Sequence, residues 1–242
     1  MSRKTRRNRP VNAPVPGAEP TTALAERKSR RGLLVGLVVL AIVAALAVYA
    51  LRGPGGVPRG DGDAARTAAL ASEHSPSIGD PGARVHVVEF LDPACETCAQ
   101  FYPVVKQLMA QNPGRIRLSV RHVAFHEGAE YAVRALEASR AQGLYWQALE
   151  ALLQTQSQWA PHHTVRAELV DPVLARVGLD MQRLAADMAA PEVQQRVTRD
   201  REDAMTLKVT ATPEYYVNGR PLPQFGYEPL LGLLREELDR AY

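Results

Sequence analysis

The stretch FLDPACETCAQFYP, residues 90–103, contains both cysteines of this 242-residue chain, separated by two residues. The apolar run RVHVVEFLD at residues 84–92 leads into it and predicts a buried strand. From Cys95 to about Gln111 the apolar residues recur at helical spacing, so Cys95 should lie at a helix N-terminus. The alternating run RIRLSVRHVAF at residues 115–125 predicts a second strand. Together these segments form a predicted βαβ unit.

The spacing of the two cysteines favours redox chemistry. A helix N-terminus carries partial positive charge and free N–H groups, which lower the pKa of a thiol placed there. Cys95 is therefore the expected nucleophile, and Cys98, one turn further into the helix, the expected resolving thiol. Two alternatives remain open: a structural disulfide that closes a short loop, and half of a zinc site. The sequence has no second C-x-x-C to complete such a site, and its histidines are scattered.

Beyond this unit the sequence predicts a helical block, a hairpin and a final helix. Residues from about 127 to 207 are mostly amphipathic at helical spacing. The run EYYVNGRPL, residues 214–222, places Asn218 and Gly219 between two extended segments, which is a hairpin signal. An amphipathic helix is expected at residues 227–242. The order β-α-β, helices, β-β and α predicts an α/β sandwich with a helical subdomain inserted between its halves.

Four motifs, in order, resemble the DsbA-like branch of the thioredoxin-fold oxidoreductases. VEFLDPACETCAQFYP, residues 88–103, is similar to the active-site region of that family: an apolar strand, an acidic residue and a proline, C-x-x-C and an aromatic residue. Pro103 matches the proline that kinks the active-site helix. ALEASRAQGLYWQALEALLQ, residues 135–154, is similar to the inserted helical domain, and VTATPEYYVNGRPL, residues 209–222, to the strand preceded by a Thr and a cis-proline. The resemblance covers residues 77–242.

The resemblance implies a thioredoxin-like α/β fold with an inserted helical subdomain, and the activity of a protein thiol:disulfide oxidoreductase. Cys95 and Cys98 would be the catalytic pair. Thr212 and Pro213 would form a cis-proline loop beside them and present backbone groups to an extended substrate segment. No organic cofactor and no metal is implied.

Two positions between the cysteines depart from the family. Glu96 and Thr97 stand where strongly oxidising relatives carry a Pro-His pair. A carboxylate beside the nucleophile should oppose its thiolate and make the disulfide less oxidising, unless Glu96 is a solvated surface residue. Glu89, in the apolar strand, is a further candidate. A buried carboxylate beneath the cysteines could relay protons to Cys98, although strand alternation could equally turn it to solvent.

Three segments precede the predicted domain. Residues 1–31 combine many basic residues with four prolines and are expected to form a disordered cytoplasmic tail. GLLVGLVVLAIVAALAVYAL, residues 32–51, has no charged residue and is long enough for a transmembrane helix, with the basic cluster before it on the cytoplasmic side. A cleaved signal peptide is the alternative, but the long basic region favours an uncleaved signal anchor. Residues 52–76 are expected to be a flexible Gly-rich linker.

The placement of charge argues against nucleic-acid binding. Residues 1–31 carry nine Lys or Arg and two Glu, a net charge of +7, whereas the whole chain has a net charge of +3. The remaining residues therefore sum to −4, so a basic tail precedes a mildly acidic body. A basic face of the kind that binds nucleic acid is not expected.

These observations predict a single-pass protein of the cell membrane whose extracytoplasmic domain exchanges disulfides with exported proteins, in disulfide formation. A membrane redox partner that resets the cysteine pair is a further expectation. Two alternatives stay open. A reductase or isomerase of the same fold would reverse the electron flow, and Glu96 leans that way. A non-enzymatic tethered binding or metal-handling module would use the same fold without catalysis.

Overall fold

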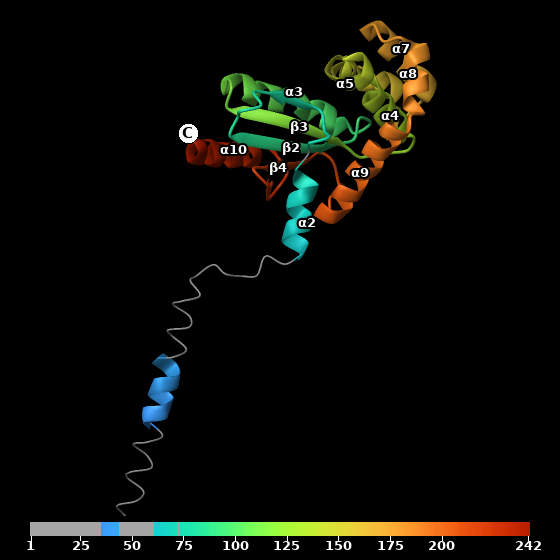
Figure 1. Cartoon of the computed structure of the whole chain (residues 1–242). Coiled ribbons are helices and arrows are strands. Elements are labelled where there is room, and N and C mark those ends of the chain that lie inside the picture. The colour runs from blue at the N-terminus through green and yellow to red at the C-terminus, as the bar shows by residue number, and fades with distance from the viewer. Residues whose placement is uncertain (1–34, 44–60, 72) are drawn as a thin grey trace, which may run out of the picture. The chain divides into compact units, whose positions relative to one another are not determined.

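Figure 1 shows the computed structural model of the chain, which describes residues 35–43, 61–71 and 73–242. The chain divides into two units, Met1–Pro58 and Arg59–Tyr242. In the first unit, the described residues are helical. Across the described residues, no helix combines the length and the apolar character that a membrane crossing requires.

The expectations for the N-terminal segments fall largely outside the described residues. These include the tail at residues 1–31, both ends of the apolar segment at residues 32–51 and the first part of the linker. Within the apolar segment, the large Val, Leu and Ile side chains of residues 35–43 are each more than half exposed.

A five-stranded sheet forms the centre of the second unit, in the order β1-β3-β2-β4-β5. Strands β2 and β3 run parallel, as the predicted βαβ unit requires. Antiparallel pairing adds β1 beside β3, β4 beside β2 and β5 beside β4. The strands are β1 (Ser77–Gly79), β2 (Val85–Leu91), β3 (Ile116–His122), β4 (Glu214–Val217) and β5 (Arg220–Pro221).

A helical block lies beside the sheet, between β3 and β4 in the chain, and its last helix, α9, leads back toward the sheet (Figure 1). The helical block expected at about residues 127–207 is confirmed and includes α7, α8 and α9. The helices of the second unit are α2 (Asp61–Leu70), α3 (Glu96–Gln111), α4 (Ala129–Ser139), α5 (Tyr145–Gln154), α6 (Gln156–Trp159), α7 (Ala167–Val177), α8 (Met181–Met188), α9 (Pro191–Leu207) and α10 (Tyr227–Ala241), with 3₁₀ turns η1 (Arg140–Gln142) and η2 (Pro161–His163).

The two faces of the sheet pack against different helices. Val85, Val87 and Leu91 of β2 join the larger core, which includes side chains of α3 and α10. Val88 and Phe90 point to the opposite face and pack with α2 and the C-terminal end of α9. All five side chains are at most 3% exposed. Because both faces of β2 are covered, five of its seven residues are apolar and they do not alternate with polar ones as in a half-exposed strand.

Helix α2 differs from the flexible linker expected at residues 52–76. Residues 61–70 are helical and contact α9, and Ala69 is only 2% exposed. The guanidinium of Arg121, on β3, donates a hydrogen bond to the Ala69 carbonyl at 2.7 Å. The linker was predicted from Gly-rich composition, which is a local signal, whereas the burial of helix α2 depends on a partner surface that is distant in sequence.

Acidic residues of α9 balance the charge of the fully buried Arg121. Its Nε donates to Asp200 Oδ1 at 2.6 Å, and another guanidinium nitrogen pairs with Asp203. The His74 ring and the backbone N–H of His122 also donate to the Asp200 carboxylate. Burial alone would raise the pKa of Asp200, but hydrogen bonds from His74 and Arg121 outweigh burial and hold this pKa below its ordinary value. The cluster ties α2 and α9 to the sheet.

We predict that Asp200→Asn lowers the free energy of unfolding by about 3 kcal/mol, because it removes a carboxylate partner of a buried cation. Because the pKa of Asp200 is lower in the folded than in the unfolded protein, its ionised carboxylate stabilises the fold fully above about pH 4. This contribution to the free energy of unfolding is lost as the pH falls through the folded-state pKa. Urea denaturation at neutral pH measures the change, with Glu202→Gln as an exposed control on the same helix. Equal unfolding midpoints for the two variants would contradict this role of Asp200.

Candidate active site

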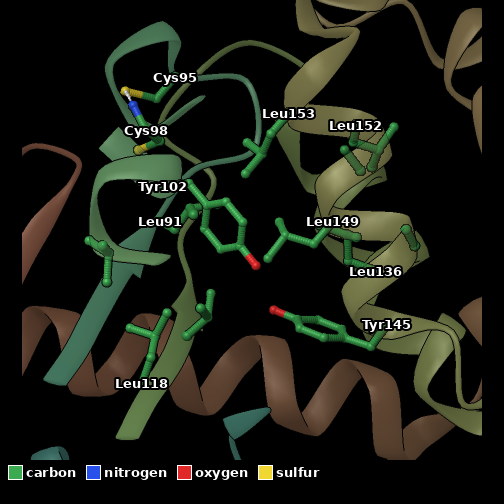
Figure 2. Packing of buried hydrophobic residues seen from close by; sticks show 14 of the residues in the cluster. Leu91, Cys95, Cys98, Tyr102, Leu118, Leu136, Tyr145, Leu149, Leu152 and Leu153 are labelled. Carbon is green, nitrogen blue, oxygen red and sulfur yellow. Dashed lines mark hydrogen bonds between the residues drawn. The ribbon is translucent and has the colours of Figure 1, made fainter. Parts of the chain in front are cut away.

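The expected nucleophile caps helix α3. Cys95 is the N-cap residue, has extended backbone geometry, and its Sγ accepts a hydrogen bond from the Cys98 N–H at 3.4 Å. Figure 2 shows this bond and the two sulfurs at the margin of the apolar core. Cys95 is 6% exposed, Cys98 is completely buried, and both are free thiols. Cys95 therefore keeps a small exposed fraction at the end of the helix, whereas Cys98 has none.

The same geometry separates the acidities of the two thiols. The side-chain hydrogen bond with Cys98 lowers the pKa of Cys95 to about 5. Partial burial opposes this shift, whereas Thr212 and the backbone N–H groups of Cys98 and Thr97 assist it. Burial raises the pKa of Cys98 far above its ordinary value, and the nearby Cys95 and Glu89 add to the rise. At neutral pH the pair therefore consists of a Cys95 thiolate and a Cys98 thiol.

The loop before β4 lies against the nucleophile. The Thr212–Pro213 peptide bond is cis, as the sequence context predicted. The Cys95 thiol donates a hydrogen bond to the Thr212 carbonyl at 3.3 Å, although the two residues are 117 positions apart. In the thiolate form Cys95 has no proton to donate, and a hydrogen bond from the Thr212 side chain stabilises the charge. This loop is thus part of the immediate surroundings of the reactive sulfur.

Glu89 is completely buried beneath the cysteines. Its Oε1 accepts a hydrogen bond from Tyr215 at 3.0 Å, and Tyr215 is its register partner on β4. Burial raises the pKa of Glu89 to about 8; the Tyr215 bond counteracts part of this, and the Cys95 charge adds to it. Among the described residues, Glu89 Oε2 has no hydrogen-bond partner. Of the two orientations that strand alternation allowed, the structure has the inward one.

The two residues between the cysteines lie at the outer edge of the site. Glu96 is exposed in the first turn of α3, and Thr97 is half-buried. Water screens the charge of an exposed carboxylate. The opposition expected from Glu96 therefore does not prevent the pKa of Cys95 from falling to about 5.

Asp92 organises the turn between β2 and α3, a role that the sequence analysis missed. The residue is fully buried, and its carboxylate accepts hydrogen bonds from the backbone N–H groups of Ala94, Phe125 and His126. Its carbonyl accepts from the Cys95 N–H at 3.0 Å. An acidic residue before a proline at a strand end was the available signal, because such residues bond their own turn. The partner loop after β3 could not be identified from that signal.

The histidines considered as zinc ligands make other contacts. His122 is hydrogen-bonded to Tyr145 at 2.7 Å, and the His126 ring donates to Asp92 at 2.8 Å. His163, from the helical block, lies 3.3 Å from the Ala94 carbonyl oxygen. Within residues 35–43, 61–71 and 73–242, no three His, Cys, Asp or Glu side chains converge as metal ligands would.

Comparison with known proteins places this site in a family. A family model described as thioredoxin matches residues 71–234. A solved thioredoxin-like oxidoreductase from Silicibacter pomeroyi is 29% identical, with a TM-score of 0.60 over 70% of this chain and 95% of its own. Wolbachia pipientis alpha-DsbA1 shares the fold, with a TM-score of 0.62 at 17% identity over 73% of this chain and 97% of its own.

Curated relatives match a similar share of the chain. The Na(+)/H(+) antiporter NhaA of Herminiimonas arsenicoxydans is 33% identical over 144 residues, which are 60% of this chain and 22% of the antiporter. The chain thus spans about a fifth of the length of the antiporters that it matches. The probable disulfide bond formation protein D of Bacillus anthracis is 25% identical over 150 residues, 59% of this chain and 69% of that protein. Because the family model covers more than half of the sequence, the chain belongs to the thioredoxin family.

Proposed function

We propose that this protein is a membrane-anchored, extracytoplasmic thiol:disulfide oxidoreductase that forms disulfides in exported proteins. The difference in acidity within the C-x-x-C pair carries this proposal: the pKa of Cys95 is lowered to about 5, and the pKa of Cys98 is raised. A sulfur of low pKa is a good leaving group in thiol-disulfide exchange. A stabilised thiolate also favours the reduced form of the pair, which makes its disulfide an oxidant.

Oxidation of a substrate takes two exchanges, starting from the Cys95–Cys98 disulfide. A substrate thiolate attacks Cys95 Sγ, the bond between the two cysteines breaks, and Cys98 leaves and takes up a proton. A second substrate thiolate attacks the substrate sulfur of the mixed disulfide, and Cys95 leaves as a thiolate. The substrate loses two electrons and two protons, the cysteine pair gains the two electrons, and one proton remains in solvent. A membrane redox partner then accepts the electrons and restores the disulfide.

Glu89 carries the proton between solvent and Cys98 in this scheme. Its pKa of about 8 keeps the carboxyl protonated at neutral pH. When Glu89 is ionised, its charge raises the pKa of Cys98, so the two groups are close enough to interact. A protonated carboxyl beside a leaving thiolate can act as a general acid, and the resulting carboxylate as the base when Cys98 is oxidised again. Thr212 and Pro213 border Cys95 on the other side and are assigned to binding an extended substrate segment.

The apolar segment at residues 32–51 is assigned to the membrane anchor. It has no charged residue, and the cluster Arg27, Lys28, Arg30 and Arg31 precedes it. Positively charged residues beside a membrane segment stay on the cytoplasmic side. The basic cluster before residue 32 therefore places the catalytic domain, which follows the segment, on the opposite side of the membrane. The anchor would hold the cysteine pair near membrane-bound electron acceptors and newly exported chains.

The principal test traps the mixed disulfide. Cys98→Ser should accumulate reducible adducts with exported proteins, because Cys95 still attacks a substrate disulfide but the internal step that releases it is lost. Cys95→Ser should form few adducts, since Cys98 is buried and its pKa is raised. Thr212→Val should prolong the adducts in the Cys98→Ser background. Non-reducing gels at matched expression compare the variants.

Three outcomes of this test decide against the proposal. If neither cysteine variant forms adducts and the wild type neither oxidises nor reduces a model protein, the site is a tethered binding module. If the wild type reduces a model disulfide but does not oxidise a reduced protein, the protein is a reductase. Net reshuffling of scrambled disulfides without oxidation would identify an isomerase.

We predict that Glu89→Gln slows substrate oxidation by on the order of tenfold or more, because the amide cannot transfer a proton to Cys98. Because the folded-state pKa of Glu89 is raised, ionisation costs the wild type stability as the pH rises from about 4.5 to about 8. The variant should lack this decline. Stopped-flow rates and thermal melts at both pH values measure the two effects. An unchanged rate would remove the relay.

The anchor is tested by fractionation of cells that express the full chain. We expect the chain in the membrane fraction, resistant to alkaline extraction, with the C-terminal domain protected from protease on the cytoplasmic side. Deletion of residues 32–51 provides the matched control and should prevent both membrane attachment and export. A soluble exported product that begins near residue 51 would instead establish cleavage.

A further inference from the structure

The short turn before the nucleophile has a partner for every backbone polar group. The N–H groups of Ala94 and Cys95 donate to Asp92, through its carboxylate and its carbonyl respectively. The Pro93 carbonyl accepts from the buried Gln156 side chain at 2.8 Å, and the Ala94 carbonyl faces His163 Nδ1 at 3.3 Å. Two of the four bonds therefore come from the helical block, and two from the strand end itself.

The position of His163 depends on an uncommon backbone conformation. His162 and His163 have φ angles of 54° and 60°, in the left-handed region that few non-glycine residues adopt. Such conformations persist where the surrounding structure requires them, and they are frequent at functional sites. Here they direct the half-buried His163 ring to the active-site turn, whereas His162 is exposed and has no hydrogen bond among the described residues.

A closed circuit of contacts holds the His163 ring. The ring stacks on His126, with centroids 4.7 Å apart and planes at 20°. His126 Nδ1 donates to Asp92 Oδ2 at 2.8 Å, and Asp92 Oδ1 accepts from the Ala94 N–H. Because a carbonyl oxygen only accepts hydrogen bonds, His163 Nδ1 must carry the proton. The stacking fixes the ring and directs this N–H at Ala94.

We propose that His163 is a positioning residue for the nucleophile: by donating to the Ala94 carbonyl, it fixes the peptide that precedes Cys95 and so maintains the thiolate. This inference rests on the proposed function, because it concerns the same reactive sulfur. Cys95 accepts hydrogen bonds only while it stays at the N-cap position, and its backbone orientation begins at the Ala94–Cys95 peptide. The bond also compensates the partial negative charge of a carbonyl close to the thiolate.

Position 163 allows the donor to be separated from the backbone requirement. Asparagine tolerates the left-handed region, and its Nδ2 is as many bonds from Cα as histidine Nδ1. His163→Asn therefore keeps a donor at the same reach. Glycine adopts the same backbone without strain but offers no donor. His162→Gly is the matched control, because it makes the same change in the neighbouring residue of the same turn.

The experiment titrates the Cys95 thiolate by its ultraviolet absorbance in the reduced full-length chain, and measures the equilibrium with glutathione. For His163→Gly we expect the thiolate fraction near pH 5 to fall about threefold, as loss of one hydrogen bond of ordinary net strength predicts. The equilibrium should shift toward the disulfide by a similar factor. His163→Asn and His162→Gly should titrate like the wild type, and thermal melts check that all three variants are folded at the temperature of the titration.

The outcomes separate this inference from the proposed function. If the wild type titrates near pH 5 and exchanges disulfides but His163→Gly does the same, the positioning role is wrong and the function stands. An equal shift in His162→Gly would attribute the effect to a loosened turn, and failure of His163→Asn to restore the titration would exclude the donor. A wild type without a low-pH thiolate and without exchange would overturn the proposed function itself.

Discussion

The hydrogen bond from the Cys98 N–H to the Cys95 sulfur, at the N-terminus of α3, is the contact on which the rest of the site depends. A helix end has free N–H groups and partial positive charge, so it stabilises a thiolate at the N-cap without any cationic side chain. The pKa of Cys95 is low even though an exposed carboxylate follows it in sequence. The dipeptide between the cysteines is therefore less decisive here than Cys98, which lowers the pKa of Cys95 mainly through its side chain and also through its backbone N–H.

Burial provides the second half of the asymmetry. Cys98 lies one turn inside α3 and packs in the larger core, where ionisation is costly. Glu89 lies in the same interior with its own pKa raised. Burial makes ionisation costly for both the carboxyl of Glu89 and the thiol of Cys98. A proton released by one of these groups is therefore readily accepted by the other. The core under the helix thus stabilises the fold and also keeps the resolving thiol protonated.

The sheet and the helical block contribute to the site in different ways. Asp92 directly follows strand β2, and its carboxylate accepts hydrogen bonds from the turn before Cys95 and from the loop after β3. The block then supplies Gln156 and His163 to the two carbonyls of that turn. The helical block, which is inserted between β3 and β4 in the chain, therefore contacts the turn that precedes the reactive cysteine and helix α3. On the opposite face, the buried Arg121 pairs with α9 and holds α2 against the sheet.

The sequence by itself determined the order of elements from β2 onward and the C-x-x-C pair at a helix start, because apolar periodicity, turn residues and short motifs are local signals. The cis-proline loop followed from the resemblance to the DsbA-like family, and strand β1 was not predicted. It left the orientation of Glu89 open and treated residues 61–70 as linker. It missed Asp92 as an organising residue and gave no role to His163. Asp92, His163 and Arg121 form hydrogen bonds with residues that are 33, 69 and 79 positions away in the sequence. Only the tertiary structure could therefore decide the roles of these three residues. Burial and long-range hydrogen bonds arise when strands and helices pack together, and a local pattern does not record which distant surface a side chain will meet.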